Sequence, residues 1–168
     1  MFLLLVRHAI AEDRVAFSHS GQDDALRPLS AEGRKKMRPV VEALRDLLPG
    51  AELLATSPLL RAHQTAQMLS AAFDLAPVVC EALAPGANPD ALLRWLRAQR
   101  SASTVIAVGH EPALSEFAAF ALTGRPQEFF SLKKGGACLL EFPSAWRSGA
   151  AMLHWLLAPA QLRRLADA

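Results

Sequence analysis

Cysteine is scarce in this sequence. Only two cysteines, Cys80 and Cys138, occur among its 168 residues. Both lie inside apolar segments, and neither belongs to a CxxC pattern or to a His-rich pattern. The sequence therefore predicts neither a zinc site nor a disulfide framework. We expect two buried, unreactive thiols.

An excess of charge of one sign is also missing. The 18 Lys and Arg residues and the 16 Asp and Glu residues leave a formal net charge of +2. The densest basic pairs are Lys133-Lys134 and Arg163-Arg164, which fall short of the broad basic face of a nucleic-acid-binding domain. We expect no nucleic-acid partner and interpret both pairs as solvated surface.

Long apolar runs are lacking as well. The N-terminal run from Phe2 to Val6 has no basic segment before it, and a membrane span needs about 20 apolar residues. We expect no membrane partner and a cytoplasmic protein. With 52% hydrophobic and 20% charged residues, the composition is that of an ordinary folded protein. Residues 1–168 are predicted to form a single domain, and we expect a monomer.

What the sequence does contain is an alternation of short apolar runs, typical of buried strands, with segments that carry helix start signals. We predict strands at 2–6, 53–55, 77–80, 104–108, 137–142 and 151–157. We predict helices from Ser30 to 49–50, with Pro39 kinking or dividing it, from Ser57-Pro58 to Phe73, from 88, from 112 and after 159. The polar stretch 12–27 is predicted to be a mobile loop. This order indicates a three-layer α/β/α sandwich with a mostly parallel, roughly six-stranded sheet.

Charged and nucleophilic side chains follow three of the predicted strands. Arg7 and His8 come directly after the first strand, Ser57 and Arg61 lie at the helix start after the second, and His110 follows the fourth. The carboxyl ends of parallel strands meet at one edge of a sheet, where ligands bind. A helix N-terminus also favours an anion there. The sequence therefore predicts a phosphate site at this edge.

The residue types at this edge argue against a metal or another cofactor. They bring arginine where a metal site would bring carboxylates, so we expect neither. The other histidines, His19, His63 and His154, have no such placement. We interpret them as loop, helix-surface and strand-packing residues respectively.

Four segments of the chain resemble the signatures of a known family, in order and in spacing. They read LVRHA at 5–9, LSAEG at 29–33, SPLLRAHQTA at 57–66 and VGHEP at 108–112. These segments are similar to those of the histidine phosphatase superfamily, whose fold is phosphoglycerate mutase-like. The short length and the Arg7-His8-Ala9 variant look like the SixA-type phosphohistidine phosphatases, which lack the helical insertions of other branches.

The resemblance implies a role for each residue at this edge. His8 matches the nucleophile that attacks phosphorus and becomes phosphorylated, while Arg7, Arg61 and His110 match the residues that bind the phosphoryl oxygens. Ser57 joins them as a substrate-binding residue. The chemistry requires the same groups, because a neutral imidazole nitrogen is a competent nucleophile and charge on the phosphoryl oxygens needs fixed cations.

A general acid is the remaining role to assign. The branch that hydrolyses phosphate esters places a Glu after the third strand, and Glu81 is the candidate near that place. Glu12, Asp13 and Glu111 are alternatives, and the enzyme could also work without one. The imidazole of phosphohistidine leaves more readily than an alkoxide, so proton donation matters less for that substrate.

One substitution and one missing feature complete the sequence prediction. Ala9 replaces the glycine that commonly follows the Arg-His pair, and we expect no positive φ there. No segment is long enough for a sizeable lid. We predict a phosphatase whose substrate is phosphohistidine on a protein, such as a histidine phosphotransfer domain. The alternatives are a phosphatase or mutase for small sugar or nucleotide phosphates, and a phosphate-binding module without turnover.

Overall fold

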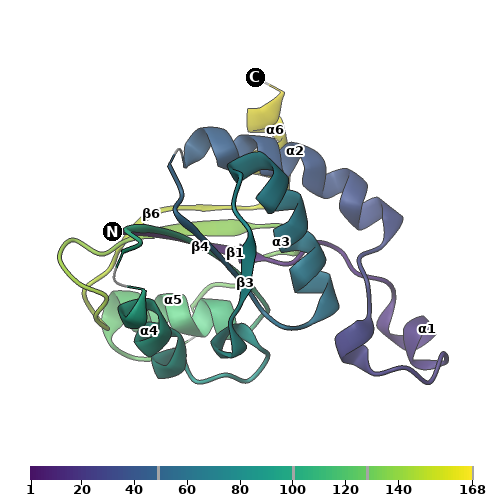
Figure 1. The fold of residues 1–168 in the computed structure, drawn as a ribbon, viewed down its shortest axis with the longest axis horizontal. Helices are drawn as coiled ribbons and strands as arrows, with labels where there is room; N and C mark the ends of the chain where they lie inside the picture. Colours follow the sequence, from purple (N-terminus) through teal and green to yellow (C-terminus); the bar gives the residue numbers. More distant parts are fainter. Residues whose placement is uncertain (49, 100, 128, 168) are drawn as a thin grey trace.

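A mixed sheet covered by helices on both faces forms the body of the protein (Figure 1). The computed structural model describes residues 1–48, 50–99, 101–127 and 129–167. The strands are β1 (Phe2–Arg7), β2 (Leu53–Thr56), β3 (Pro77–Val79), β4 (Thr104–Gly109), β5 (Ala137–Glu141) and β6 (Met152–Leu157). The helices are α1 (Arg14–Ser18), α2 (Ala31–Leu47), α3 (Leu60–Phe73), α4 (Pro89–Ala98), α5 (Ala113–Thr123) and α6 (Pro159–Ala166), with 3-10 turns η1 (Asp24–Leu26) and η2 (Glu81–Leu83).

The sheet places β1 near its centre. Its order is β3-β2-β4-β1-β5-β6, in which β1 to β4 are parallel and β5 and β6 run antiparallel to their neighbours. The predicted α/β class with a six-stranded, mostly parallel sheet is thereby confirmed for the described residues.

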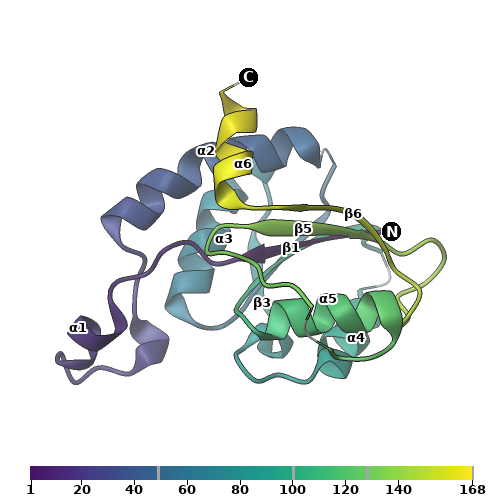
Figure 2. The same cartoon turned by 180° about the vertical axis from the view of Figure 1, so that it is seen from behind.

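The apolar run of β1 divides between two cores, because successive side chains of a strand point to opposite faces. Leu3 and Leu5 pack with α4 and α5, whereas Leu4 and Val6 pack with α2, α3 and α6. Figures 1 and 2 show these two helical layers above and below the sheet. β1 is therefore buried on both faces.

Two sequence predictions about local structure were wrong. Pro39 does not divide the predicted helix: α2 runs unbroken from Ala31 to Leu47, and Val40, Val41 and Leu44 on its buried face pack into the core. The stretch 12–27 is not a structureless loop. Its aspartates cap α1 and η1: Asp13 accepts a hydrogen bond from the backbone of Ala16, and Asp23 accepts one from Ala25.

The start of α2 lies against the chain that leaves β1. Ser30 caps the helix as predicted, since its hydroxyl accepts from the Gly33 amide at 3.0 Å. A side chain at position 33 would bring its Cβ to 1.9 Å from the carbonyl oxygen of Ile10. Only glycine therefore lets α2 approach the segment that follows His8 so closely.

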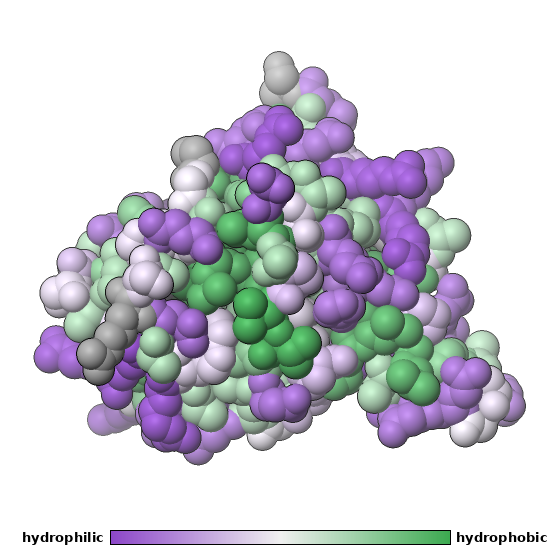
Figure 3. Space-filling view, in the orientation of Figure 1, coloured by the Kyte–Doolittle hydropathy of each residue, from purple (hydrophilic) through white to green (hydrophobic). Residues whose placement is uncertain are grey.

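Three further features of the fold lie away from the strand ends: an exposed apolar patch, the two cysteines and the character of the helices. Figure 3 shows apolar surface near the centre of one face, over the edge strand β3, where Val78 and Val79 are about half exposed. Cys80 and Cys138 are buried and unpaired, as the sequence predicted. None of the described helices combines the length and apolar character needed to cross a membrane.

Candidate active site

Backbone hydrogen bonds hold three strand ends at one place. Arg7, the last residue of β1, lies beside Gly109 at the end of β4. The amide of His8 donates to the carbonyl of Gly109 at 3.1 Å, and the amide of Ser57 donates to that of Val108 at 2.9 Å. The residues that the sequence places after β1, β2 and β4 are thus brought together by the parallel sheet itself.

A polar cavity of about 300 Å³ lies at these strand ends. The cations that line it are Arg7, Arg14, Arg27, Arg61 and Lys134. His8 and His110 also line it, together with two carboxylates, Asp24 and Glu111. Because the cations outnumber the carboxylates, the cavity is suited to an anion.

His8 is held in one orientation and one tautomer. Its side chain is buried, and its Nδ1 lies 2.7 Å from the carbonyl oxygen of Ala9. Because a carbonyl can only accept, Nδ1 carries the hydrogen and the neutral ring leaves Nε2 with a free lone pair. Burial, with smaller contributions from Arg61, Arg7 and Lys134, lowers the pKa of His8 to about 3. The ring is thus neutral, as a nucleophile must be.

His110 lies next to His8, with 4.9 Å between the two ring centroids. Its Nε2 is 2.8 Å from the hydroxyl of Ser57. Burial first, then the proximity of His8 and the arginines, lowers the pKa of His110 to about 3. The cavity therefore contains two neutral imidazoles among cations, and an entering anion would be attracted by those cations.

These lowered pKa values predict that both imidazoles stay neutral when the free protein is brought from pH 8 to pH 5. Long-range ¹H–¹⁵N NMR should find His8 with its hydrogen on Nδ1 throughout this range. The unfolded chain binds protons at these positions below about pH 6.5, while the folded chain does not until about pH 3. Stability should fall as pH decreases through that window. A titration of His8 near pH 6.5 in the folded protein contradicts this account.

The two predicted phosphate-binding arginines each have one buried donor atom without a partner among the described residues. Arg7 donates from Nη1 to the carbonyl of Leu132 at 2.6 Å, and Arg61 donates from Nη1 to the carbonyl of Asp24 at 2.9 Å. The Nε atoms of both are buried and have no hydrogen-bond partner within the described residues. Buried donors are rarely left unsatisfied, so a bound oxyanion is the natural acceptor for both.

Asp24 organises the arginines that come from the 12–27 segment. Its carboxylate accepts from Arg27 Nε at 2.8 Å and lies 3.3 Å from Arg61 Nη2 and 3.8 Å from Arg14 Nε. The hydrogen bond from Arg27 is the main cause that lowers the pKa of Asp24. Sequence reasoning missed Arg14, Asp24 and Arg27. The one available signal was the i, i+3 spacing of Asp24 and Arg27.

Glu111 and Asp24, the carboxylates of the cavity, are both engaged with protein groups. Glu111 accepts from the amide of Leu132 at 2.7 Å and from the hydroxyl of Ser115 at 2.6 Å. Asp24 is held by the arginines as an anion. Among the described residues that line the cavity, both carboxyl groups are thus engaged in contacts within the protein.

The other candidate general acids lie elsewhere. Glu81 is exposed at the start of η2 and lines a different depression beside Cys80 and Trp95. Glu12 and Asp13 are exposed and are not among the residues that line the cavity. The structure therefore does not bring Glu81 to the two histidines.

Ser57 differs from its predicted place. It was expected to cap the helix after β2, but α3 begins at Leu60 with Leu59 as its N-cap residue. The hydroxyl of Ser57 instead accepts weakly from the Leu59 amide at 3.3 Å and contacts His110. Ser57 thus contacts His110, the neighbour of His8. The cavity is lined by Leu59 and Arg61 from the start of α3.

Ala9 fits without strain at the position where glycine was expected. Asp74 is the one non-glycine residue with positive φ in the described part of the chain, so the prediction for Ala9 is confirmed. The amide of Ala9 donates to Thr65 Oγ1 at 3.1 Å, and Thr65 donates to the carbonyl of Arg61 at 2.8 Å. This chain of hydrogen bonds couples the position of His8 to that of Arg61.

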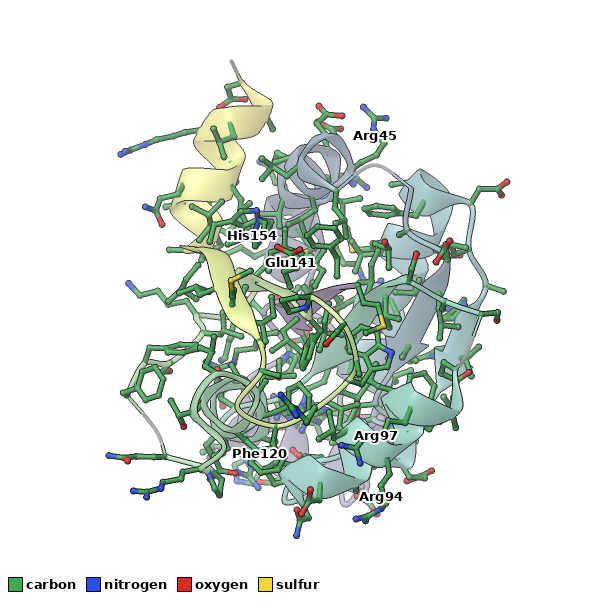
Figure 4. All side chains as sticks on the ribbon, turned by 90° about the vertical axis from the view of Figure 1, so that its left-hand side faces the viewer. Arg45, Arg94, Arg97, Phe120, Glu141 and His154 are labelled. Carbon is green, nitrogen blue, oxygen red and sulfur yellow. The ribbon has the colours of Figure 1, made fainter. Side chains whose placement is uncertain are left out.

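The remaining histidines are not among the residues that line the cavity. His19 follows α1, and His63 lies half-buried on α3. Figure 4 shows His154 and Glu141 together on β6 and β5, and His154 Nε2 is 2.6 Å from a Glu141 oxygen. Across residues 1–48, 50–99, 101–127 and 129–167, no group of three or more His, Cys, Asp or Glu is arranged to hold a metal ion.

Comparisons with known proteins agree with this geometry. A model of the histidine phosphatase superfamily (branch 1) matches residues 3–84. An uncharacterized protein from Picosynechococcus sp. is 37% identical over 157 residues, which cover 92% of this chain and 89% of that protein.

Two solved structures have the same fold. The protein histidine phosphatase SixA, solved with tungstate, aligns with a TM-score of 0.81 at 20% identity, covering 96% of this chain and 99% of that one. A phosphoserine phosphatase mutant from Entamoeba histolytica, solved with phosphoserine, aligns with a TM-score of 0.69 at 18% identity, covering 96% and 98%. Residues 3–84 thus match the histidine phosphatase superfamily, and the whole chain has the fold of the SixA protein histidine phosphatase.

Proposed function

We propose that this protein is a phosphatase that removes the phosphoryl group from phosphohistidine on a partner protein. Nε2 of His8 attacks phosphorus, the N–P bond of the substrate breaks, and the leaving imidazole takes a proton from solvent. Water then attacks the phosphorylated His8, the Nε2–P bond breaks, and inorganic phosphate is released. Arg7, Arg61 and His110 bind the phosphoryl oxygens in both steps, with Ser57 beside His110.

The choice of substrate rests on one observation: the carboxyl groups at the cavity are engaged with other protein groups, and Glu81 lies outside it. Asp24 is ion-paired with arginines, and both oxygens of Glu111 accept hydrogen bonds from the protein. Glu81 lies outside the cavity. An ester needs a proton on its leaving oxygen, and general acid catalysis contributes about 10²–10⁴-fold there. The N–P bond of phosphohistidine depends less on such a donor.

A small-molecule phosphatase is the second candidate. Both a protein histidine phosphatase and a phosphoserine phosphatase share this fold, so the fold does not decide between them. The cavity contacts are dominated by cations for the phosphoryl group. A site that holds little besides phosphate discriminates poorly among small esters, which favours the protein substrate.

The decisive experiment compares two substrate classes in the same enzyme. A histidine phosphotransfer domain phosphorylated on its histidine should have a kcat/KM at least about 10²–10⁴-fold above that of a phosphoserine peptide or a sugar phosphate. Among aryl phosphates, kcat/KM should fall steeply as the pKa of the leaving phenol rises. A better kcat/KM for a sugar phosphate overturns the proposal.

Glu81→Gln is the matched control for this experiment. Because Glu81 lies outside the cavity, the variant should leave both substrate classes unchanged. A selective loss of ester hydrolysis in Glu81→Gln would identify it as the general acid, and the argument from the carboxyl groups would then fail.

A further inference from the structure

A second cavity, of about 190 Å³, lies beside the catalytic one between α2 and α6. We refer to it as the side cavity. Its walls are apolar where Ile10, Met37, Val40 and Pro159 line it. Figure 2 shows α6 crossing α2 on this side of the sheet, with the start of α6 close to the start of β5.

Cations line the same cavity. Lys36 on α2, Lys134 before β5 and Arg163 on α6 all contribute to it, and no carboxylate does. Lys36 pairs with Glu32 on its own helix, whereas Lys134 and Arg163 form no ion pair with the described residues. The side cavity therefore combines an apolar interior with two cations, Lys134 and Arg163, that form no ion pair with the described residues.

The side cavity is held rigidly next to the catalytic cavity. The turn before β5 is fixed to β1, because the Gly135 amide donates to the Arg7 carbonyl at 3.1 Å and the Arg7 amide donates to Gly136 at 3.0 Å. Lys134 on this turn lines both cavities. Ala9, the residue after His8, also lines the side cavity.

We propose that the side cavity receives an apolar side chain of the phosphorylated partner protein, flanked there by carboxylates that meet Lys36, Lys134 and Arg163. This inference rests on the proposed function and names the surface by which the protein substrate is recognised. The partner is a folded protein that places its phosphohistidine in the catalytic cavity. Close to the phosphohistidine in space, it carries a segment with an apolar side chain and neighbouring carboxylates.

The size of the side cavity favours a side chain over a metabolite. Small-molecule sites commonly enclose about 300–1,000 Å³, and this cavity is smaller. A single apolar side chain fits a volume of this order. Because Lys134 lines both cavities, a protein with its phosphohistidine beside His8 has its surface next to the side cavity. Charge around a small apolar contact then selects partners by complementarity.

Charge reversal at one of two adjacent arginines tests this inference. Arg163 is half-buried and lines the side cavity, whereas Arg164 is exposed and does not. Arg163→Glu should raise KM for the phosphorylated histidine phosphotransfer domain about 5- to 10-fold. Arg164→Glu makes the same change in net charge and should leave KM close to that of the wild type. On α2, Lys36→Glu and Lys35→Glu form a second matched pair.

A small substrate separates docking from catalysis. Hydrolysis of p-nitrophenyl phosphate should be unchanged in all four variants, because none of these residues lines the catalytic cavity. Equal effects of Arg163→Glu and Arg164→Glu on the protein substrate, or a parallel loss on p-nitrophenyl phosphate, overturn the docking inference alone. If the wild type hydrolyses p-nitrophenyl phosphate but no phosphohistidine protein, the proposed function falls and the docking inference falls with it.

Discussion

Replacing His8 with alanine should lower turnover by about 10⁴-fold or more, because removal of the nucleophile from an enzyme with a covalent intermediate commonly costs that much. In the structure, the Nδ1–H of His8 is fixed by the carbonyl of Ala9, and burial keeps the ring neutral. No other imidazole in the described part of the chain has both features, since His110 is bound through Nε2 to Ser57. His110 should therefore not substitute for His8.

The phosphorylated intermediate gives a direct test of this assignment. Rapid quench with labelled phosphohistidine domain should trap an adduct on His8 that is labile in acid and stable in alkali. His63→Ala is the control, because His63 lies on α3 but does not line the cavity. Undiminished activity in a folded His8→Ala protein, or no adduct on His8 under burst conditions, rules out His8 as the nucleophile.

The central part of the site could be predicted because it depends on sheet topology. Arg7 is the last residue of β1, while His8, Ser57 and His110 each stand directly after a strand, and parallel strands must bring their carboxyl ends together. The apolar runs of those strands are easy to recognise, so the spatial cluster follows from positions along the chain. The same logic places Arg61, since α3 begins at Leu60, shortly after β2 ends at Thr56.

The outer part of the site could not be predicted in this way. Arg14, Asp24 and Arg27 come from a polar segment without apolar periodicity. They are held at the cavity by contacts with one another and with Arg61, and by the hydrogen bond from Arg27 to the Glu12 carbonyl. Lys134 was interpreted as solvated surface. It is exposed, yet the backbone hydrogen bonds of Gly135 and Gly136 place it at the cavity. Such contacts are visible only in three dimensions.

The general acid shows a different limit of sequence reasoning. Glu81 follows β3, so its place in the chain suits a catalytic carboxyl group, but it lies in η2 facing a different depression. The side-chain direction in a short 3-10 turn depends on local packing that no sequence period reveals. The role of Glu81 thus remains a prediction that Glu81→Gln decides.

Replacing Arg61 with alanine should lower kcat/KM by about 10²–10³-fold, the cost of losing one preorganised donor to transition-state charge. Arg61 is buried at the start of α3, with its Nη atoms turned to Asp24 and its Nε without a partner. Both kcat and kcat/KM should fall, because charge on the phosphoryl oxygens changes most in the transition state.

Two further variants separate the charge of Arg61 from its shape. Arg61→Lys keeps a cation but loses the planar fork that binds two oxygens, so its activity should lie between those of wild type and Arg61→Ala. Added guanidinium should partly restore Arg61→Ala, since the vacated space is lined by the same acceptors, while Arg38→Ala on the exposed face of α2 should behave as wild type. Wild-type kinetics in a folded Arg61→Ala protein would show that phosphoryl binding rests on Arg7, Arg14 and Arg27 instead, and the assignment of Arg61 would have to be withdrawn.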